Sequence, residues 1–214
     1  VTRRAAKQVH YDLADEGEHL ADQRLASLQN YRTSLQAACK EKVILENCPW
    51  KHVMQPLRAA VVRHALPLQP LHDLITAFER DVRNTRNGHV YADWDELADY
   101  ACHSANPVGR LMLHLYEVDD ADSLRQSDAI CTALQLINFW QDLSEDLPRG
   151  RFYLTEADCQ RFGITRQDLQ AAQVTPAMHQ LLTDSSAWAA APSPSTGQVV
   201  SSPSMNCSHS TSGS

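Results

Sequence analysis

The sequence lacks a long hydrophobic run, a glycine-rich nucleotide loop and a secretory leader. A membrane-spanning helix needs about 20 mostly apolar residues, and no stretch of the chain comes near that length. The 7 glycines form neither GxGxxG nor a P-loop, which argues against a fold that binds dinucleotides or nucleoside triphosphates. Residues 1–10 are basic but have no apolar core behind them, so they do not form a signal peptide. We therefore expect a cytoplasmic protein.

Basic charge and paired cysteines are also scarce. The chain has 26 acidic and 19 basic residues, a net charge of −7, and this balance argues against nucleic acid as a partner. The 6 cysteines are scattered and include no CxxC pair. That arrangement is typical of reduced cytosolic thiols rather than of a disulfide framework or a zinc site. Neither HExxH nor GxSxG occurs, so the zinc-protease and serine-hydrolase motifs are absent.

Helical periodicity covers most of the chain. We expect helices at about residues 18–40, 56–65, 69–86, 93–104, 107–117, 123–146, 155–161 and 165–172. Residues 185–214 differ, because they contain eleven serines and no Asp, Glu, Lys or Arg. Such a stretch cannot bury enough apolar surface to fold. The sequence therefore predicts one helical domain over residues 1–184 and a disordered tail over residues 185–214.

The most informative stretch is residues 127–153. Four polar residues follow one another there at steps of three, four and four: Gln135, Asn138, Asp142 and Asp146. These steps put the four side chains on one face of a helix. Because their neighbours are largely apolar and aromatic, we expect this helix to be buried nearly all round. An unpaired buried carboxylate is very costly, so the stripe predicts a wet cavity that holds a cation, with Gln135 and Asn138 contacting the substrate.

Carboxylates occur in two groups. Asp142 and Asp146 lie one helical turn apart, a spacing at which they can jointly hold a hard cation such as Mg²⁺. The same spacing is common on solvated helix faces, and that alternative stays open. Asp12, Asp15 and Glu16 form a second group, which is either an acidic helix end or an array that faces the first. Two facing arrays could clamp a diphosphate through Mg²⁺ and promote ionisation of its C–O bond.

Two basic segments are candidates for contact with phosphate. Arg149 and Arg151 lie in the turn PRGRFY, where their forked donors suit phosphate oxygens. A basic surface turn at a helix C-terminus is the alternative. Tyr100 and Arg110 flank small residues that include Gly109, which allow a ligand or another helix to approach closely. The alternative for that segment is a joint between two packed helices.

Five segments together resemble the trans head-to-head prenyl synthases, which are the squalene and phytoene synthases. They span residues 11–17, 24–35, 63–82, 91–116 and 127–164. The last segment reads NFWQD where the phytoene branch more often has NxxRD, and this favours the hydroxysqualene branch of bacterial hopanoid biosynthesis. The resemblance implies an all-α isoprenoid-synthase bundle with Mg²⁺ held by two Asp-rich motifs. Asp12, Asp15 and Glu16 fall on the first motif, and Asp142 and Asp146 fall on the second.

The resemblance also implies a reaction. Tyr100 falls on a tyrosine expected in acid–base or cation-steering steps, and Arg110 and Arg151 would lie near the diphosphate. Presqualene diphosphate would ionise, and water would capture the cation to give hydroxysqualene. A reductive variant would give squalene with hydride from NADPH, a cofactor that the sequence does not indicate. The apolar product also suggests a peripheral contact with the membrane.

The chain departs from the family pattern in two places. Tyr11 stands where the first motif usually has its first Asp, which removes one expected metal ligand. The family continues past residue 164 into helices that complete the cavity, whereas this chain turns into the serine-rich segment. We therefore expect a bundle that is truncated at both ends. Condensation of two farnesyl diphosphates and a non-catalytic remnant are the alternatives to the presqualene reaction.

Overall fold

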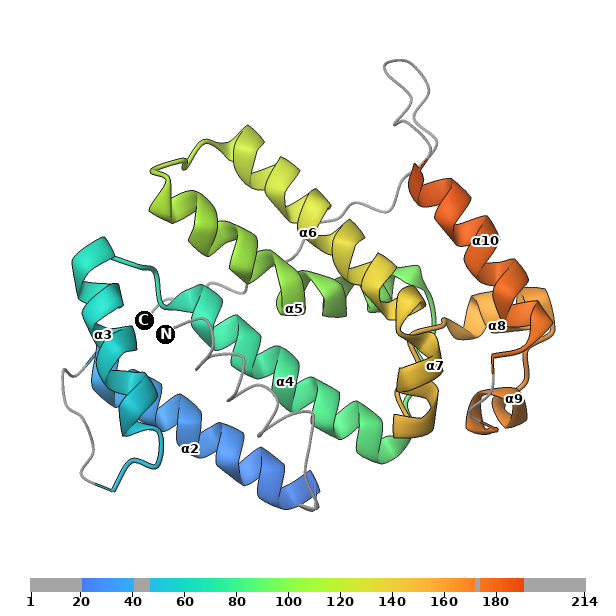
Figure 1. The fold of residues 1–214 in the computed structure, drawn as a ribbon, viewed down its shortest axis with the longest axis horizontal. Helices are drawn as coiled ribbons and strands as arrows, with labels where there is room; N and C mark the ends of the chain where they lie inside the picture. Colours follow the sequence, from blue (N-terminus) through green and yellow to red (C-terminus); the bar gives the residue numbers. More distant parts are fainter. Residues whose placement is uncertain (1–20, 41–46, 172–173, 191–214) are drawn as a thin grey trace. The chain divides into compact units, whose positions relative to one another are not determined.

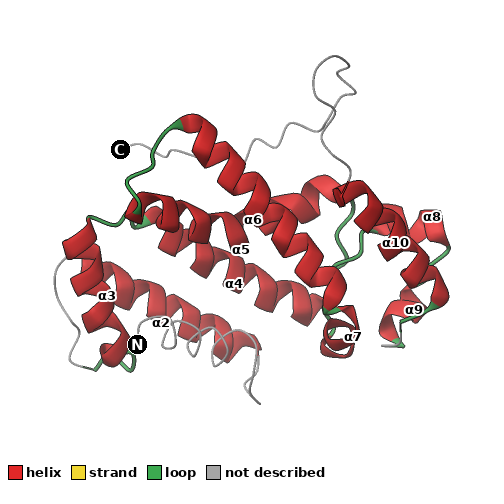
Figure 2. Ribbon diagram, turned by 45° about the horizontal axis from the view of Figure 1, so that its top comes forward, coloured by secondary structure: helices red, strands yellow, loops and turns green. Residues whose placement is uncertain are grey.

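The structure is a computed structural model that describes residues 21–40, 47–171 and 174–190, with side chains as far as Asp184. Every named element in these ranges is helical (Figure 2). The one β-type pairing within them is a single parallel bridge between Val90 and Phe152. The all-α class expected from the sequence is confirmed. No described helix is long and apolar enough to cross a membrane.

The described helices follow one another in a simple order. They are α2 (Ala21–Cys39), α3 (Lys51–His64), α4 (Gln69–Asn87), α5 (Trp94–Leu115), α6 (Ala121–Gln141), α7 (Leu143–Asp146), the 3-10 helix η2 (Leu147–Arg149), α8 (Glu156–Phe162), α9 (Arg166–Gln170) and α10 (Pro176–Ala190). The chain divides into two compact units. The first holds the described parts of Val1–Asn87 and His103–Cys131, and the second those of Gly88–Cys102 and Thr132–Ser214. Helices α5 and α6 contribute residues to both units.

In the first unit, α2 packs against α3 and α4 (Figure 1). The buried core of this packing consists of Leu35, Ala38, Cys48, Met54 and Ile75. Arg32 of α2 adds polar contacts to α4, because it donates to the Thr76 hydroxyl at 3.0 Å and lies 3.3 Å from the Glu79 carboxylate. Apolar burial and a shared arginine therefore hold the same two helices together.

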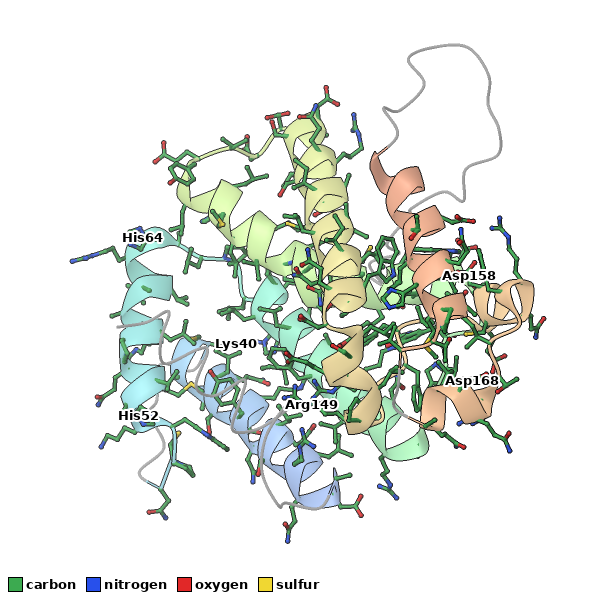
Figure 3. All side chains as sticks on the ribbon, turned by 45° about the vertical axis from the view of Figure 1, so that its right-hand side comes forward. Lys40, His52, His64, Arg149, Asp158 and Asp168 are labelled. Carbon is green, nitrogen blue, oxygen red and sulfur yellow. The ribbon has the colours of Figure 1, made fainter. Side chains whose placement is uncertain are left out.

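In the second unit, α8 and α9 each begin at a threonine. Thr155 Oγ1 accepts a hydrogen bond from the Asp158 N–H at 3.1 Å, and Thr165 Oγ1 accepts one from the Asp168 N–H at 3.2 Å. The Thr165 N–H in turn donates to the Asp168 carboxylate at 2.8 Å, which completes a capping box. Asp158 and Asp168 lie in the first turns of the two helices (Figure 3). These caps satisfy N–H groups that have no partner inside the helix.

Prolines interrupt the helices less than the sequence predicts. Residues 93–104 and 107–117 were expected to form two helices, but α5 runs without a break through Pro107. Likewise α3 begins at Lys51 and contains Pro56, which was expected to start the helix. A proline inside a helix removes one backbone hydrogen bond. Next to Pro107, Asn106 is 4% exposed, so tertiary packing outweighs the local preference for a break.

The chain after α6 also differs from expectation. The helix expected over residues 123–146 is interrupted at Asp142, where the backbone departs from helical angles (φ −93°, ψ 10°). Helix α10 was not expected, and it continues past the predicted domain end at Asp184. Residues 191–214 of the predicted tail lie outside the described residues.

Candidate functional site

The middle of the polar stripe continues an exposed row of residues on α6. Ile130 is 59% exposed and Leu134 is 55% exposed, and Asn138 and Asp142 continue the same exposed row at steps of four. The opposite side of the helix is buried through Thr132, Leu136, Phe139 and Trp140. The expectation of a helix buried nearly all round is therefore wrong. Apolar content alone predicted burial on both sides, whereas the described chain packs only one side of α6.

The two carboxylates of the stripe lie one turn apart, as their spacing requires. The Asp146 N–H donates to the Asp142 carbonyl at 2.9 Å, so the helical turn between them is intact. Their surroundings differ, because Asp142 is exposed and Asp146 is only 7% exposed. Gln135, on the preceding turns, is half-buried. The stripe thus presents one accessible carboxylate and one enclosed carboxylate.

A basic turn follows Asp146 and brings an arginine back to it. Gly150 adopts a left-handed conformation (φ 73°), which permits the Arg151 N–H to donate to the Asp146 carbonyl at 3.0 Å. The Arg151 side chain then lies 3.7 Å from the Asp146 carboxylate, and both side chains are 10% exposed. Arg149 remains exposed on η2 (Figure 3). The PRGR turn therefore places one enclosed and one exposed guanidinium directly after the carboxylate pair.

The chemistry of these donors suits Mg²⁺, which prefers carboxylate oxygens and usually keeps water and substrate phosphates in its coordination shell. Within the described residues no group of three or more His, Cys, Asp and Glu side chains gathers as a metal site. Of the predicted metal ligands, Asp142 and Asp146 lie within the described residues. The other predicted ligands, Asp12, Asp15 and Glu16, lie outside the described residues.

Tyr100 lies in an aromatic cluster of the second unit. It is 5% exposed, and its ring stacks at 5.9 Å from Phe139 and 6.0 Å from Tyr153 between centroids. Phe139 and Tyr153 themselves stack at 3.9 Å with 9° between their planes. Phe139 follows Asn138 on α6, so the cluster is continuous with the stripe helix. Sequence reasoning did not assign Phe139 or Tyr153 to the site, although both lie within the stretch that it singled out.

Arg110 lies in the first unit and is held by a carboxylate. Its Nε donates to Asp128 Oδ1 at 3.0 Å and its Nη2 to Asp128 Oδ2 at 2.6 Å. The adjacent Gly109 faces α6 closely, because a Cβ there would lie 2.5 Å from Ser127 Oγ and 2.6 Å from Cys131 Sγ. The sequence left open whether the small residues here admit a ligand or another helix. In the structure, Gly109 packs closely against another helix, α6. Asp128 was missed by sequence reasoning.

Comparison with known proteins places the chain in a family. The model of the squalene/phytoene synthase family matches residues 4–197. Together with the all-α fold, this match defines the class: the chain belongs to the squalene/phytoene synthase family. The resemblance that the sequence motifs carry is confirmed.

Two named enzymes and two solved structures show what the chain is similar to. The hydroxysqualene synthase of Zymomonas mobilis is 34% identical over 169 residues, which cover 74% of this chain and 52% of that protein. The hydroxysqualene synthase of Sinorhizobium fredii is 36% identical over 127 residues, which cover 59% of this chain and 42% of that protein. The chain therefore spans about half the length of the curated relatives it matches.

The structural matches agree with this assignment. The crystal structure of squalene synthase HpnC from Alicyclobacillus acidocaldarius superposes with a TM-score of 0.68 and 32% identity, covering 88% of this chain and 70% of that one. A dehydrosqualene synthase crystal structure matches with a TM-score of 0.64 at 23% identity, covering 88% of this chain and 60% of that one. The second match concerns the fold alone. The isoprenoid-synthase fold expected from the sequence is confirmed.

Proposed function

We propose that this chain is an isoprenoid synthase of the hydroxysqualene type, which ionises presqualene diphosphate and releases diphosphate. The observation that carries the proposal is the placement of two carboxylates and an arginine around α7, directly after α6. There Asp142 and Asp146 lie one helical turn apart, and Arg151 lies 3.7 Å from the second carboxylate. Carboxylates paired with arginines are what a site needs to bind a metal–diphosphate leaving group.

In this proposal each residue has a distinct task. Asp142 and Asp146, with Asp12, Asp15 and Glu16, would hold Mg²⁺. When bound, the ion would neutralise charge that develops on the departing diphosphate. The described part of this ligand set would combine an exposed carboxylate, Asp142, with a buried one, Asp146.

The basic and amide side chains would bind the rest of the substrate. Arg149 and Arg151 would donate to phosphate oxygens through planar guanidinium groups. Gln135 and Asn138 would contact substrate along the same helix face. Arg110, the further arginine predicted near the diphosphate, is engaged in two hydrogen bonds to Asp128.

The aromatic cluster would act on the carbocation. Tyr100 stacks on Phe139 and Tyr153, and the faces of aromatic rings attract cations. Enclosure by these rings would also delay attack by water until the cation has rearranged. Capture by water gives hydroxysqualene, whereas hydride from NADPH would give squalene.

Condensation of two farnesyl diphosphates is a second candidate function. The observation in its favour is the similarity to the 15-cis-phytoene synthase of Synechocystis, which is 34% identical over 116 residues covering 49% of this chain and 33% of that protein. A contact of the chain with a membrane surface would suit either product, since both carry long apolar prenyl chains.

Product analysis separates these functions. The purified chain is incubated with Mg²⁺ and either presqualene or farnesyl diphosphate, with and without NADPH, and products are identified by mass spectrometry. We expect hydroxysqualene from presqualene diphosphate without NADPH. Presqualene diphosphate formed from farnesyl diphosphate would favour condensation. If neither substrate reacts but a diphosphate analogue with Mg²⁺ raises the melting temperature, the chain is a binding remnant rather than an enzyme.

A further inference from the structure

Residues 88–92, called here the strap, precede α5 and are fixed by backbone hydrogen bonds in the second unit. The Glu156 N–H donates to the Tyr91 carbonyl at 2.7 Å, and the Ala157 N–H donates to the Ala92 carbonyl at 3.1 Å. These bonds tie the strap to the first residues of α8. The main chain at Tyr91 is therefore fixed by a neighbour that lies more than sixty residues later in the sequence.

The first turn of α5 holds the strap through one carboxylate. Glu96 Oε2 accepts from the Ala92 N–H at 2.7 Å, and Glu96 Oε1 lies 2.9 Å from His89 Nε2. The His89 ring meets the Tyr91 ring edge to face at 5.1 Å. Tyr91 is 2% exposed. The strap is thus fixed by two elements, and it presents a fully enclosed aromatic ring.

The ring of Tyr91 lies against the aromatic cluster. Its centroid is 5.7 Å from that of Tyr100, with 35° between the planes, and 6.2 Å from that of Tyr153, with 21° between the planes. Tyr100 is consequently bordered by rings from three segments, with Phe139 on α6 as the third. Aromatic pairs at these separations prefer defined relative orientations. A fixed Tyr91 therefore limits the orientations open to Tyr100.

We propose that Tyr91 is a positioning residue that holds the Tyr100 ring in the orientation needed for cation steering. This inference rests on the proposed function, in which Tyr100 faces the carbocation. We assign the effect to the ring of Tyr91, which is the part that lies beside the Tyr100 ring. Displacement of a group that acts on the reacting centre by about 1 Å can cost on the order of 100-fold in rate, so loss of this ring lowers kcat while substrate binding through the carboxylates and arginines persists.

The experiment compares four variants by steady-state kinetics of diphosphate release from presqualene diphosphate. Tyr91→Leu removes the ring and Tyr91→Phe keeps it. His89→Ala loosens the strap at a half-exposed residue, so this variant tests the idea even if Tyr91→Leu does not fold. Tyr31→Leu is the matched control, because Tyr31 is a partly buried tyrosine of the first unit that packs edge to face on Trp50 at 5.3 Å.

We expect Tyr91→Leu to lower kcat at least about tenfold with KM within about twofold of the parent. His89→Ala should lower kcat by a smaller factor, whereas Tyr91→Phe and Tyr31→Leu should keep it within about twofold. An unchanged kcat in both Tyr91→Leu and His89→Ala overturns the inference, as does an equal loss in Tyr91→Phe. Failure of the unsubstituted chain to release diphosphate overturns the proposed function itself, and with it this role of Tyr91.

Discussion

Two arginine–carboxylate pairs in this chain have different geometries, and the difference separates a structural joint from a candidate site. In the first unit, Arg110 makes two hydrogen bonds to Asp128, at 3.0 and 2.6 Å, between α5 and α6. In the second unit, Arg151 lies 3.7 Å from Asp146 within one local turn, and both side chains are 10% exposed. The first pair is joined by two direct hydrogen bonds, whereas the second is a longer contact between two enclosed side chains.

An arginine predicted near the diphosphate site is therefore not by itself evidence of substrate binding. Arg110 and Arg151 carried the same expectation from the sequence. Of these two arginines, only Arg151 lies beside a member of the carboxylate pair that would hold the metal–diphosphate group, at 3.7 Å from Asp146. The predictions below test whether the two pairs differ in function as they do in geometry.

The largest effect is expected at the pair formed by Arg151 and Asp146. Arg151→Ala should lower kcat/KM for presqualene diphosphate on the order of 100-fold, because a guanidinium that stabilises the leaving group is lost. Steady-state diphosphate release measures this. Arg161→Ala is the matched control, since Arg161 is an exposed arginine of α8 in the same unit. Equal losses in the two variants would mean that general charge, rather than the position of Arg151, supports the reaction.

A smaller effect, on stability, is expected at the pair formed by Arg110 and Asp128 between α5 and α6. Asp128→Asn should lower the free energy of unfolding by about 1 kcal/mol, because a charged bidentate pair at a partly exposed position becomes a weaker polar contact. Urea denaturation measures the change. KM for presqualene diphosphate should stay within about twofold. A clear change in KM would contradict a purely structural role for the pair, because it would show that Arg110 binds the substrate when Asp128 no longer holds it.

A stability change without a catalytic change is also expected within the second unit. Thr165→Ala removes the side chain that caps α9, and loss of such a cap costs about 1 kcal/mol or less at an exposed helix start. Thr165→Ser retains the hydroxyl and should restore the parent stability. A drop in kcat for Thr165→Ala, measured well below its melting temperature, would mean that the whole second unit responds to local fraying.

The smallest effect is a dependence of stability on pH in the first unit. Burial, followed by the nearby Arg32, lowers the pKa of His72 below its ordinary value. The folded protein then binds fewer protons than the unfolded chain just below about pH 6.5, so His72 favours the folded state above that pH and its contribution is lost as pH falls. Urea midpoints between about pH 5 and pH 7 should show a flatter slope for His72→Gln. An unchanged slope would contradict this assignment.

Much of the fold could be predicted from the sequence, because helical periodicity and capping residues are local. The starts of α8 and α9 follow from Thr155 and Thr165, and the absence of strand alternation gave the all-α class. The continuity of α5 through Pro107 could not be predicted, because it depends on packing around Asn106 that sequence spacing does not show. The two-unit division also depends on long-range contacts.

The candidate site was predicted in part. The spacing of Asp142 and Asp146 required no knowledge of the tertiary structure, and the resemblance placed both on a family motif. The exposure of Leu134 and Asn138 could not be predicted, because it depends on which side of α6 finds neighbours. The pairing of Arg110 with Asp128 likewise joins two helices, so no single segment revealed it.

The carboxylate pair formed by Asp142 and Asp146 at the two ends of α7 can be tested most directly by comparing two neighbouring acidic residues. Diphosphate release from presqualene diphosphate with Mg²⁺ is measured for Asp146→Asn and for Glu145→Gln, which changes an exposed carboxylate of the same short helix. We predict a loss on the order of 100-fold for Asp146→Asn and a rate within about twofold of the parent for Glu145→Gln. Equal rates in the two variants would contradict the assignment of Asp146 to the site.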